Sequence, residues 1–144
     1  MRMKRFYRMK QRGMTLVELL VVLVILGLLA GLVGPQVLNQ LGGAKTKTAN
    51  VQIKDLEQGA ELFKLDVGRF PTNQEGLDAL VTKPATAPGW NGPYLKEHRV
   101  PLDPWGHPYH YKFPDAHGGL EIYSLGADNA EGGTGEDADV GRTN

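Results

Sequence analysis

The sequence predicts an α+β fold in which one long N-terminal helix packs against a small sheet formed by the rest of the chain. Three observations predict it. Residues 19–33 are apolar throughout, and apolar residues recur at three- and four-residue spacing between positions 49 and 67. Two short stretches later in the chain, 109–113 and 120–125, have the composition and alternation of strands.

The apolar segment is long enough to cross a membrane. No residue from Leu19 to Ala44 is charged, and a bilayer core needs about 20 mostly apolar residues as helix, so residues 16–38 suffice. A buried core helix is a poor alternative, because a chain of 144 residues has too little protein to surround a helix that is apolar on every side. A removable signal peptide and a retained membrane anchor both remain possible.

The formal net charge of zero hides two segments of opposite sign. Residues 1–13 carry six basic side chains and no acidic one, which leaves ten basic and sixteen acidic side chains for the remainder. The basic block is expected to stay in the cytoplasm while the C-terminal body crosses the membrane. An acidic body argues against nucleic-acid binding, and the lack of cysteine excludes disulfides, thiol catalysis and cysteine-ligated metals.

Glu18 stands near the start of the apolar segment, where a carboxylate costs about 2–3 kcal/mol on insertion scales. One interpretation is an interfacial glutamate at the cytoplasmic edge. The other follows from a cut between Gly13 and Met14, which would create an α-amine four residues before Glu18. That amine would neutralise Glu18 of another copy packed alongside.

The helix is expected to run from near Met14 to near Gly68, with a kink or local unwinding at Gly31 to Pro35, because proline lacks a backbone donor and crowds the preceding turn. Its second half should bury one apolar stripe against the sheet. The stripe consists of Ala49, Ile53, Leu56, Ala60, Phe63 and Val67. A short helix at 76–81, a loop at 84–93 and a proline-rich turn at 101–108, with Trp105 packed on the core, complete the predicted elements.

The tail from Gly126 to Asn144 is glycine-rich and acidic, which indicates a calcium site. Calcium prefers six to eight oxygen ligands from carboxylates and backbone carbonyls, and glycines allow carbonyls to turn inward. Five acidic residues lie within twelve positions: Asp128, Glu131, Glu136, Asp137 and Asp139. The alternative is a disordered acidic tail, since the segment has too few apolar residues to order itself.

Catalysis has little support in the sequence. Ser124 follows no nucleophile elbow, and Gly133-Thr134-Gly135 follows no strand–helix phosphate-loop pattern. The four histidines are predicted to be surface or turn residues, with His107 and His110 pointing to different faces. We therefore expect a protein that is not an enzyme, although a secreted hydrolase or binding module is kept as a less favoured hypothesis.

Two groups of motifs carry a resemblance to a known family. Arg12-Gly13-Met14-Thr15-Leu16-Val17-Glu18-Leu19 resembles the processing signal of type IV pilins and pseudopilins, apart from methionine at position 14 where phenylalanine is usual. Further motifs resemble the major pseudopilins of type II secretion systems. They are Gly68-Arg69-Phe70-Pro71-Thr72, Gly92-Pro93-Tyr94-Leu95, Asp103-Pro104-Trp105-Gly106 and Ser124-Leu125-Gly126-Ala127-Asp128.

This resemblance implies the pilin-like fold: a long N-terminal helix on a small antiparallel sheet, with a calcium loop at about 124–140. It implies a cleaved leader at 1–13, a transmembrane and filament-core helix at 14–43, an amphipathic helix at 44–68 and a periplasmic globular domain at 69–144. Prepilin peptidase would cut after Gly13 and methylate Met14. The implied calcium ligands are Asp128, the carbonyl of Leu125, and either Asp137 or Asp139.

The implied function is that of the major subunit of a periplasmic pseudopilus, which polymerises to drive folded proteins across the outer membrane. Glu18 and Pro35 would act in assembly. The implied partners are further copies of the chain, minor pseudopilins, prepilin peptidase and the inner-membrane assembly platform. The chain would cross the inner membrane once, with its N-terminus in the cytoplasm. A type IV pilus or competence pilin is the alternative, although those pilins usually carry a C-terminal disulfide.

Overall fold

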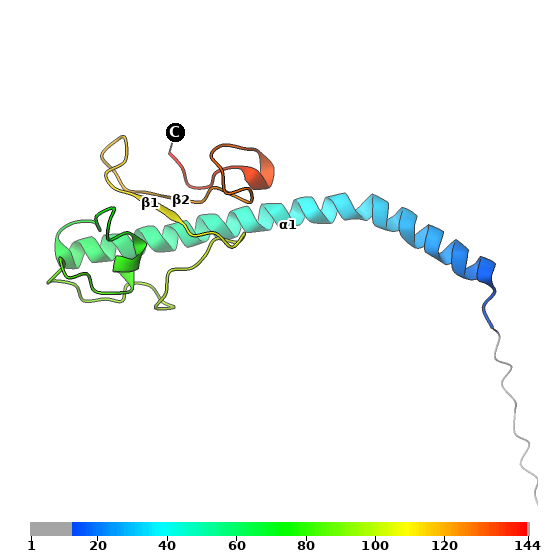
Figure 1. The fold of residues 1–144 in the computed structure, drawn as a ribbon, viewed down its shortest axis with the longest axis horizontal. Coiled ribbons are helices and arrows are strands. Elements are labelled where there is room, and N and C mark those ends of the chain that lie inside the picture. The colour runs from blue at the N-terminus through cyan, green and yellow to red at the C-terminus, as the bar shows by residue number, and fades with distance from the viewer. Residues whose placement is uncertain (1–12, 144) are drawn as a thin grey trace, which may run out of the picture. The chain divides into compact units, whose positions relative to one another are not determined.

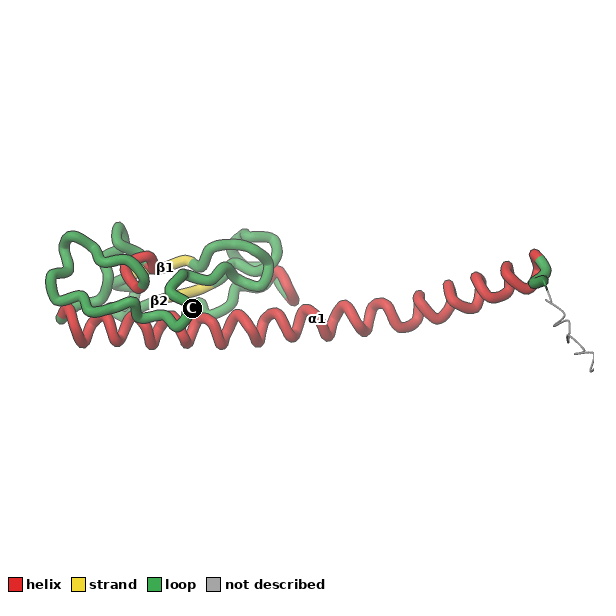
Figure 2. Tube along the Cα trace, turned by 90° about the horizontal axis from the view of Figure 1, so that it is seen from below, coloured by secondary structure: helices red, strands yellow, loops and turns green. Residues whose placement is uncertain are grey.

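The computed structural model describes residues 13–143 (Figures 1 and 2). Its elements in chain order are α1 (Leu16–Val67), the 3-10 helix η1 (Leu77–Leu80), β1 (His110–Lys112), β2 (Glu121–Tyr123) and the 3-10 helix η2 (Gly135–Asp137). The predicted α+β class is confirmed. The chain divides into two compact units, residues 1–38 and residues 39–144, and α1 contributes to both.

In the first unit, α1 presents apolar side chains on every side. The large apolar residues from Leu16 to Leu38 have exposed fractions between 46% at Val22 and 83% at Leu16. An 18-residue window of this helix has a mean hydropathy of 3.0, and none of it is buried. The segment therefore has the length and composition of a membrane-spanning helix, and its apolar surface lacks a partner among residues 13–143.

Pro35 lies inside α1, and the helix is continuous through it. Of the two alternatives predicted at Gly31 to Pro35, a kink or local unwinding, local unwinding is not present in this structure. Proline removes one hydrogen bond of the helical ladder, and the helix continues on both sides of that gap.

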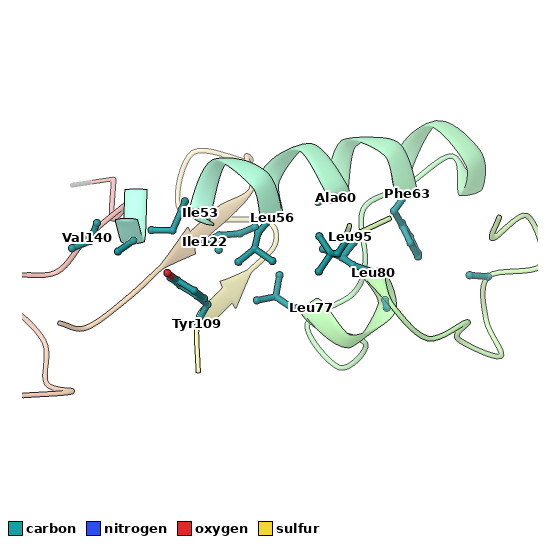
Figure 3. Close-up of a cluster of buried hydrophobic side chains, with 13 residues drawn as sticks. Ile53, Leu56, Ala60, Phe63, Leu77, Leu80, Leu95, Tyr109, Ile122 and Val140 are labelled. Atoms are coloured by element: carbon teal, nitrogen blue, oxygen red, sulfur yellow. The ribbon is translucent and has the colours of Figure 1, made fainter. Parts of the chain in front are cut away.

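In the second unit, α1 buries the predicted stripe. Figure 3 shows Ile53, Leu56 and Phe63 pointing from the helix into a cluster of apolar side chains. Val67 is only partly buried at its end. The remaining buried apolar members of the cluster are Ala49, Ala60, Leu77, Ala79, Leu80, Ala87, Leu95, Tyr109, Ile122 and Val140. Each fully buried Leu or Phe side chain contributes about 1.5–3 kcal/mol, so this cluster is the main source of stability.

The sheet is small and antiparallel, as predicted, but its strands are shorter than the sequence pattern indicates. β1 pairs with β2 in the register His110↔Tyr123, Tyr111↔Ile122 and Lys112↔Glu121. Pro108 and Pro114 flank β1, and proline cannot donate to a ladder, which limits the strand. Figure 2 shows that loops form most of the chain outside α1.

A polar cluster fixes the chain where it leaves α1. The helix ends at Val67, and Gly68 takes a φ of 85° while its N–H donates to Lys64 O at 2.8 Å, a glycine C-cap. Glu75 then binds three groups: the Arg69 guanidinium through bonds of 2.7 and 2.9 Å, the N–H of Thr72 at 2.7 Å, and the Thr86 hydroxyl.

The hydrogen bonds from Arg69 hold the pKa of Glu75 well below its usual range, against the opposing effect of burial. A carboxyl with a lowered folded-state pKa stabilises the fold above its unfolded pKa of about 4.3, and that contribution is lost as the pH falls through the folded-state value. We predict that Glu75→Gln lowers the free energy of unfolding by about 2 kcal/mol at pH 7. The difference from the parent should shrink below about pH 4, as measured by denaturation of the full chain in detergent micelles.

Glu97→Gln is the matched control. Glu97 pairs with Arg99 at 3.0 Å, but the two side chains are 69% and 77% exposed, and exposed pairs contribute about 0–1 kcal/mol. A loss for Glu75→Gln that equals the control's, or that does not change with pH, would contradict the prediction.

Candidate functional site

The N-terminal end of α1 is closed by a reciprocal pair of hydrogen bonds. The N–H of Thr15 donates to Glu18 Oε2 at 3.2 Å, and the N–H of Glu18 donates to Thr15 Oγ1 at 3.3 Å. This arrangement is a capping box, which satisfies helix N–H groups that lack partners. The Thr-x-x-Glu spacing is its sequence signal, although Thr15 is not among the predicted site residues.

Gly13 and Met14 lie in irregular backbone immediately before the helix. Met14 is 64% exposed, and a methyl group added at Gly13 would meet no atom within 4 Å. The Gly13–Met14 bond therefore lies in an uncovered segment. The rest of the predicted leader, residues 1–12, lies outside the described residues.

The acidic tail forms an ordered loop, which we call the acidic loop (residues 125–139). Its neck is an antiparallel bridge in which the N–H groups of Ser124 and Val140 each donate to the other's carbonyl at 2.9 Å. Inside the loop, the N–H of Ala127 donates to Glu136 O at 2.8 Å. Backbone bonds thus fix both ends of the loop, while its acidic side chains are mostly exposed.

The predicted carboxylate ligands differ in their bonding. Asp128 is exposed, and its Oδ1 accepts the N–H of Ala130 at 3.1 Å. Both oxygens of Asp139 are engaged: Oδ1 accepts from Gly132 at 3.2 Å, and Oδ2 pairs with Arg142 at 3.0 Å. Asp137 is exposed, and within residues 13–143 its carboxylate has no hydrogen-bond partner. The structure therefore leaves Asp137 more available than Asp139.

Backbone carbonyls crowd the inner side of the acidic loop. A Cβ built on Gly126, whose φ is 71°, would lie 2.6 Å from Glu136 O and 2.8 Å from Ala138 O. Gly133, with a φ of 85°, packs in the same way on the carbonyl of Asp137. Neither position has room for a side chain, so these glycines are needed for the carbonyls to approach.

The donor set in the loop fits calcium better than a transition metal. No group of three or more His, Asp or Glu side chains in the described part of the chain is placed to hold a metal ion. Calcium accepts carbonyl oxygens in place of side chains, and two exposed aspartates with converging carbonyls provide such oxygens. Leu125, the predicted carbonyl donor, has a carbonyl that accepts no hydrogen bond within residues 13–143.

Glu136 lies against α1 instead of facing the loop interior. Its carboxylate and Cγ cover Gly42, a buried position where a Cβ would overlap them. In the structure Gly42 is the contact that lets the loop approach the helix, which removes Glu136 from the candidate ligands.

A buried polar cluster lies beside the neck of the loop. Asp103 is 4% exposed, and its Oδ2 accepts from the hydroxyl of Ser124 at 2.6 Å. Nδ1 of His107 lies 3.2 Å from the carbonyl of Gly126 and 3.9 Å from Asp103 Oδ2. The cluster contains a serine, a histidine and an aspartate, but Ser124 is fully buried and donates to the aspartate, so it is not a nucleophile. Asp103 is not among the predicted site residues, because its bond to Ser124 joins segments 21 residues apart.

Within residues 13–143, the other histidines take no part in a cluster of ligands. His98 and His117 are exposed, and His110 stacks on Tyr123 with ring centroids 5.0 Å apart. His98 and His117 agree with the prediction of surface and turn histidines, whereas His110 lies half-buried in β1.

Comparison with known proteins identifies both parts of the chain. Residues 8–34 match the prokaryotic N-terminal methylation motif, and residues 36–143 match the type II secretion system protein G family. The chain is 47% identical to the type II secretion system core protein G of Pseudomonas aeruginosa over 138 residues, covering 93% of this chain and 96% of the relative. The protein of the same name from Vibrio cholerae is 44% identical over 138 residues, covering 94% and 93%.

The fold matches as well. The crystal structure of the major pseudopilin from the type 2 secretion system of enterohaemorrhagic Escherichia coli aligns with a TM-score of 0.58 and 30% identity, covering 69% of this chain and 85% of that chain. These matches favour a pseudopilin over a type IV pilus or competence pilin, and they identify a structural subunit instead of an enzyme. The chain belongs to the protein G family of type II secretion systems, the major pseudopilins.

Proposed function

We propose that the chain is the repeating subunit of a pseudopilus that grows from the inner membrane and drives folded proteins across the outer membrane. The observation that carries this proposal is the apolar first part of α1, exposed on every side and joined to a protein G domain. Such a surface needs lipid before assembly and the apolar helices of other copies afterwards.

The proposed topology places residues 1–13 in the cytoplasm and the second unit in the periplasm. The six basic residues of the leader support it, since positive charges close to a span stay on the cytoplasmic side. The partners we propose are further copies of the chain, minor pseudopilins at the filament tip, prepilin peptidase and the assembly platform in the inner membrane.

Processing at Gly13 is the first testable step. We predict that the chain isolated from its native membrane begins at N-methyl-Met14, as intact-mass and N-terminal peptide mass spectrometry would detect. Gly13→Ala should retain the whole leader, and because a methyl group there meets no atom, the fold should not change. A native N-terminus beyond residue 34 would instead indicate a removed signal peptide and contradict the proposal.

We propose that Glu18 pairs with the Met14 amine of a neighbouring copy in the filament. Support comes from the capping box, which uses only Oε2 of the carboxylate among residues 13–143, so that Oε1 can accept from a neighbour. In an apolar filament core an unpaired carboxylate is costly, and a cation at hydrogen-bond distance offsets that cost.

Two substitutions separate capping from pairing. Glu18→Gln retains an oxygen that can accept from Thr15, since glutamine also completes a capping box, but it loses the charge. We predict that Glu18→Gln and Glu18→Ala both abolish filaments, as seen by electron microscopy of cells producing the secretion system. Removing the charge leaves the neighbour's amine unpaired in the filament core.

Asp78→Asn is the control, because Asp78 is an exposed acid of η1 and its side chain makes no hydrogen bond within residues 13–143. It should assemble normally. Normal filaments from Glu18→Gln alongside none from Glu18→Ala would assign Glu18 to capping only and rule out the charge pair.

We also propose a role for Pro35 in assembly. The helix lacks one backbone hydrogen bond there, and Gly31 and Gly34 lie within the preceding turn. This is the place where α1 opens at the lowest cost, so a change of helix length on packing into the filament would occur there.

We further propose that the acidic loop binds calcium through Asp128, Asp137 and the carbonyl of Leu125. The ion would supply positive charge that neutralises the loop carboxylates and holds their oxygens together. The carbonyls packed on Gly126 and Gly133, together with the unengaged carboxylate of Asp137, support this assignment. Asp139 is the alternative second ligand, but it is already paired with Arg142.

Calcium removal should lower the melting temperature of the full chain in detergent micelles. A ligand at a hundred times its Kd stabilises a fold by about 2.7 kcal/mol, which corresponds to a fall in Tm of roughly 10 °C on chelation for a domain of this size. Magnesium should not restore the Tm, because it demands a small octahedral site. An unchanged melt in chelator would refute the metal loop.

Variants of the two aspartates assign the second ligand. Asp137→Asn should abolish the calcium-dependent rise in Tm and leave the calcium-free Tm nearly unchanged. Asp139→Asn should lower the Tm with and without calcium, because it breaks the pair with Arg142. The reverse pattern would make Asp139 the ligand.

A further inference from the structure

Asp103 carries a buried carboxylate that lacks a close cationic partner in residues 13–143. Its side chain is fully buried, and the nearest basic atom is His107 Nδ1 at 3.9 Å. Burying a carboxylate is costly unless hydrogen bonds compensate for the lost water. Asp103 accepts three: Oδ1 from the N–H groups of Trp105 at 3.1 Å and His107 at 2.8 Å, and Oδ2 from Ser124 Oγ at 2.6 Å.

A second aspartate, Asp115, makes the same hydrogen bonds within a turn and serves as a comparison for Asp103. Asp115, in the loop between β1 and β2, uses its Oδ1 to accept the N–H groups of His117 at 2.8 Å and Gly119 at 2.6 Å, and it is only half-buried. Its bonding reproduces the Oδ1 half of the Asp103 arrangement. Asp103 differs from Asp115 in its second oxygen. That oxygen is buried and accepts a hydrogen bond from Ser124, 21 residues further along the chain.

Ser124 links Asp103 to the acidic loop. Its backbone pairs with Val140 at the neck, and its Oγ accepts the N–H of Gly126 at 3.1 Å. His107, from the same turn as Asp103, lies with Nδ1 3.2 Å from the carbonyl of Gly126. Because that carbonyl is only an acceptor, His107 Nδ1 is the donor.

The turn at 103–107 therefore holds both sides of Leu125. Ser124 before it and Gly126 after it are each bound to a side chain of the turn, so the orientation of the Leu125 peptide is fixed from outside the loop. Asp128 follows three residues later. In metal sites, loss of a group that orients the ligands without touching the ion typically weakens metal binding by roughly 10–100-fold.

We propose that Asp103 is a positioning residue for the calcium site and acts through Ser124 on the start of the acidic loop. This inference rests on the proposed calcium site. Asp103 sets the direction of the Leu125 carbonyl before the ion arrives, so the loop loses less freedom on binding. The Asp-Pro-Trp-Gly turn then serves the metal loop as well as the fold.

The test is isothermal calorimetry of calcium binding to the full chain in detergent micelles, after calcium removal by dialysis against a chelator. Ser124→Ala keeps the turn and removes the link, and Asp103→Asn keeps an acceptor for the turn but removes the charge. Each should raise the calcium Kd about tenfold. The double variant should raise it no further than the larger single effect, because both changes break one link. Asp115→Asn, the matched control, should leave the Kd unchanged.

Two results would overturn the inference, and they are distinguishable. If the parent protein binds calcium, and Ser124→Ala and Asp103→Asn keep the parent's Kd while lowering the Tm with and without calcium alike, Asp103 is purely part of the fold. If the parent protein itself takes up no calcium, the proposed metal loop fails, and the positioning role fails with it. Because Ser124→Ala leaves the backbone bonds of Asp103 in place, its Kd can be measured even if Asp103→Asn does not fold.

Discussion

The second unit depends on one stripe of α1 that packs against the chain following it. No other element of this unit is long enough to organise a core, since each strand has three residues and η1 has four. Buried apolar side chains from η1, from the loops, from β2 and from Val140 converge on this stripe. Two glycines of the helix allow close approach: Gly59 lies under Leu95 and Gly42 under Glu136. The helix is thus the template on which mostly irregular backbone takes one conformation.

The acidic loop is tied to this template from three directions. Glu136 rests on Gly42, Val140 belongs to the core, and Ser124 reaches the turn at 103–107 through Asp103. Carbonyl and carboxylate oxygens still lie close together in the loop, with few apolar contacts, and their negative charges repel one another. Arg142 offsets part of this charge by pairing with Asp139 and Glu131. Calcium in the proposed site would neutralise the part that Arg142 does not reach, which explains how a loop without disulfides holds its shape.

Periodicity predicted the helix, its buried stripe and the positions of both strands, because those features depend on residues close together in sequence. The functional contacts that it missed join distant segments. Nothing near Asp103 indicates that its second oxygen binds Ser124, and nothing near Gly42 indicates Glu136. At Pro35 the local rule predicted a kink or local unwinding, and the helix runs through without unwinding. The capping box could have been predicted from the sequence, because Thr15 and Glu18 are only three residues apart.

In the proposed pairing, Glu18 connects processing to assembly. In the isolated chain its carboxylate caps its own helix through one oxygen, at the end where the helix dipole favours negative charge. Because the second oxygen is not used by the cap, pairing with a neighbour would not require the helix to lose its first turn. The amine proposed as its partner exists only after the Gly13–Met14 bond is cut, and the same cut removes six positive charges. Those charges would otherwise repel one another at the centre of the filament. Cleavage in the proposed mechanism therefore removes a repulsion and creates an attraction at one position, which makes assembly conditional on processing.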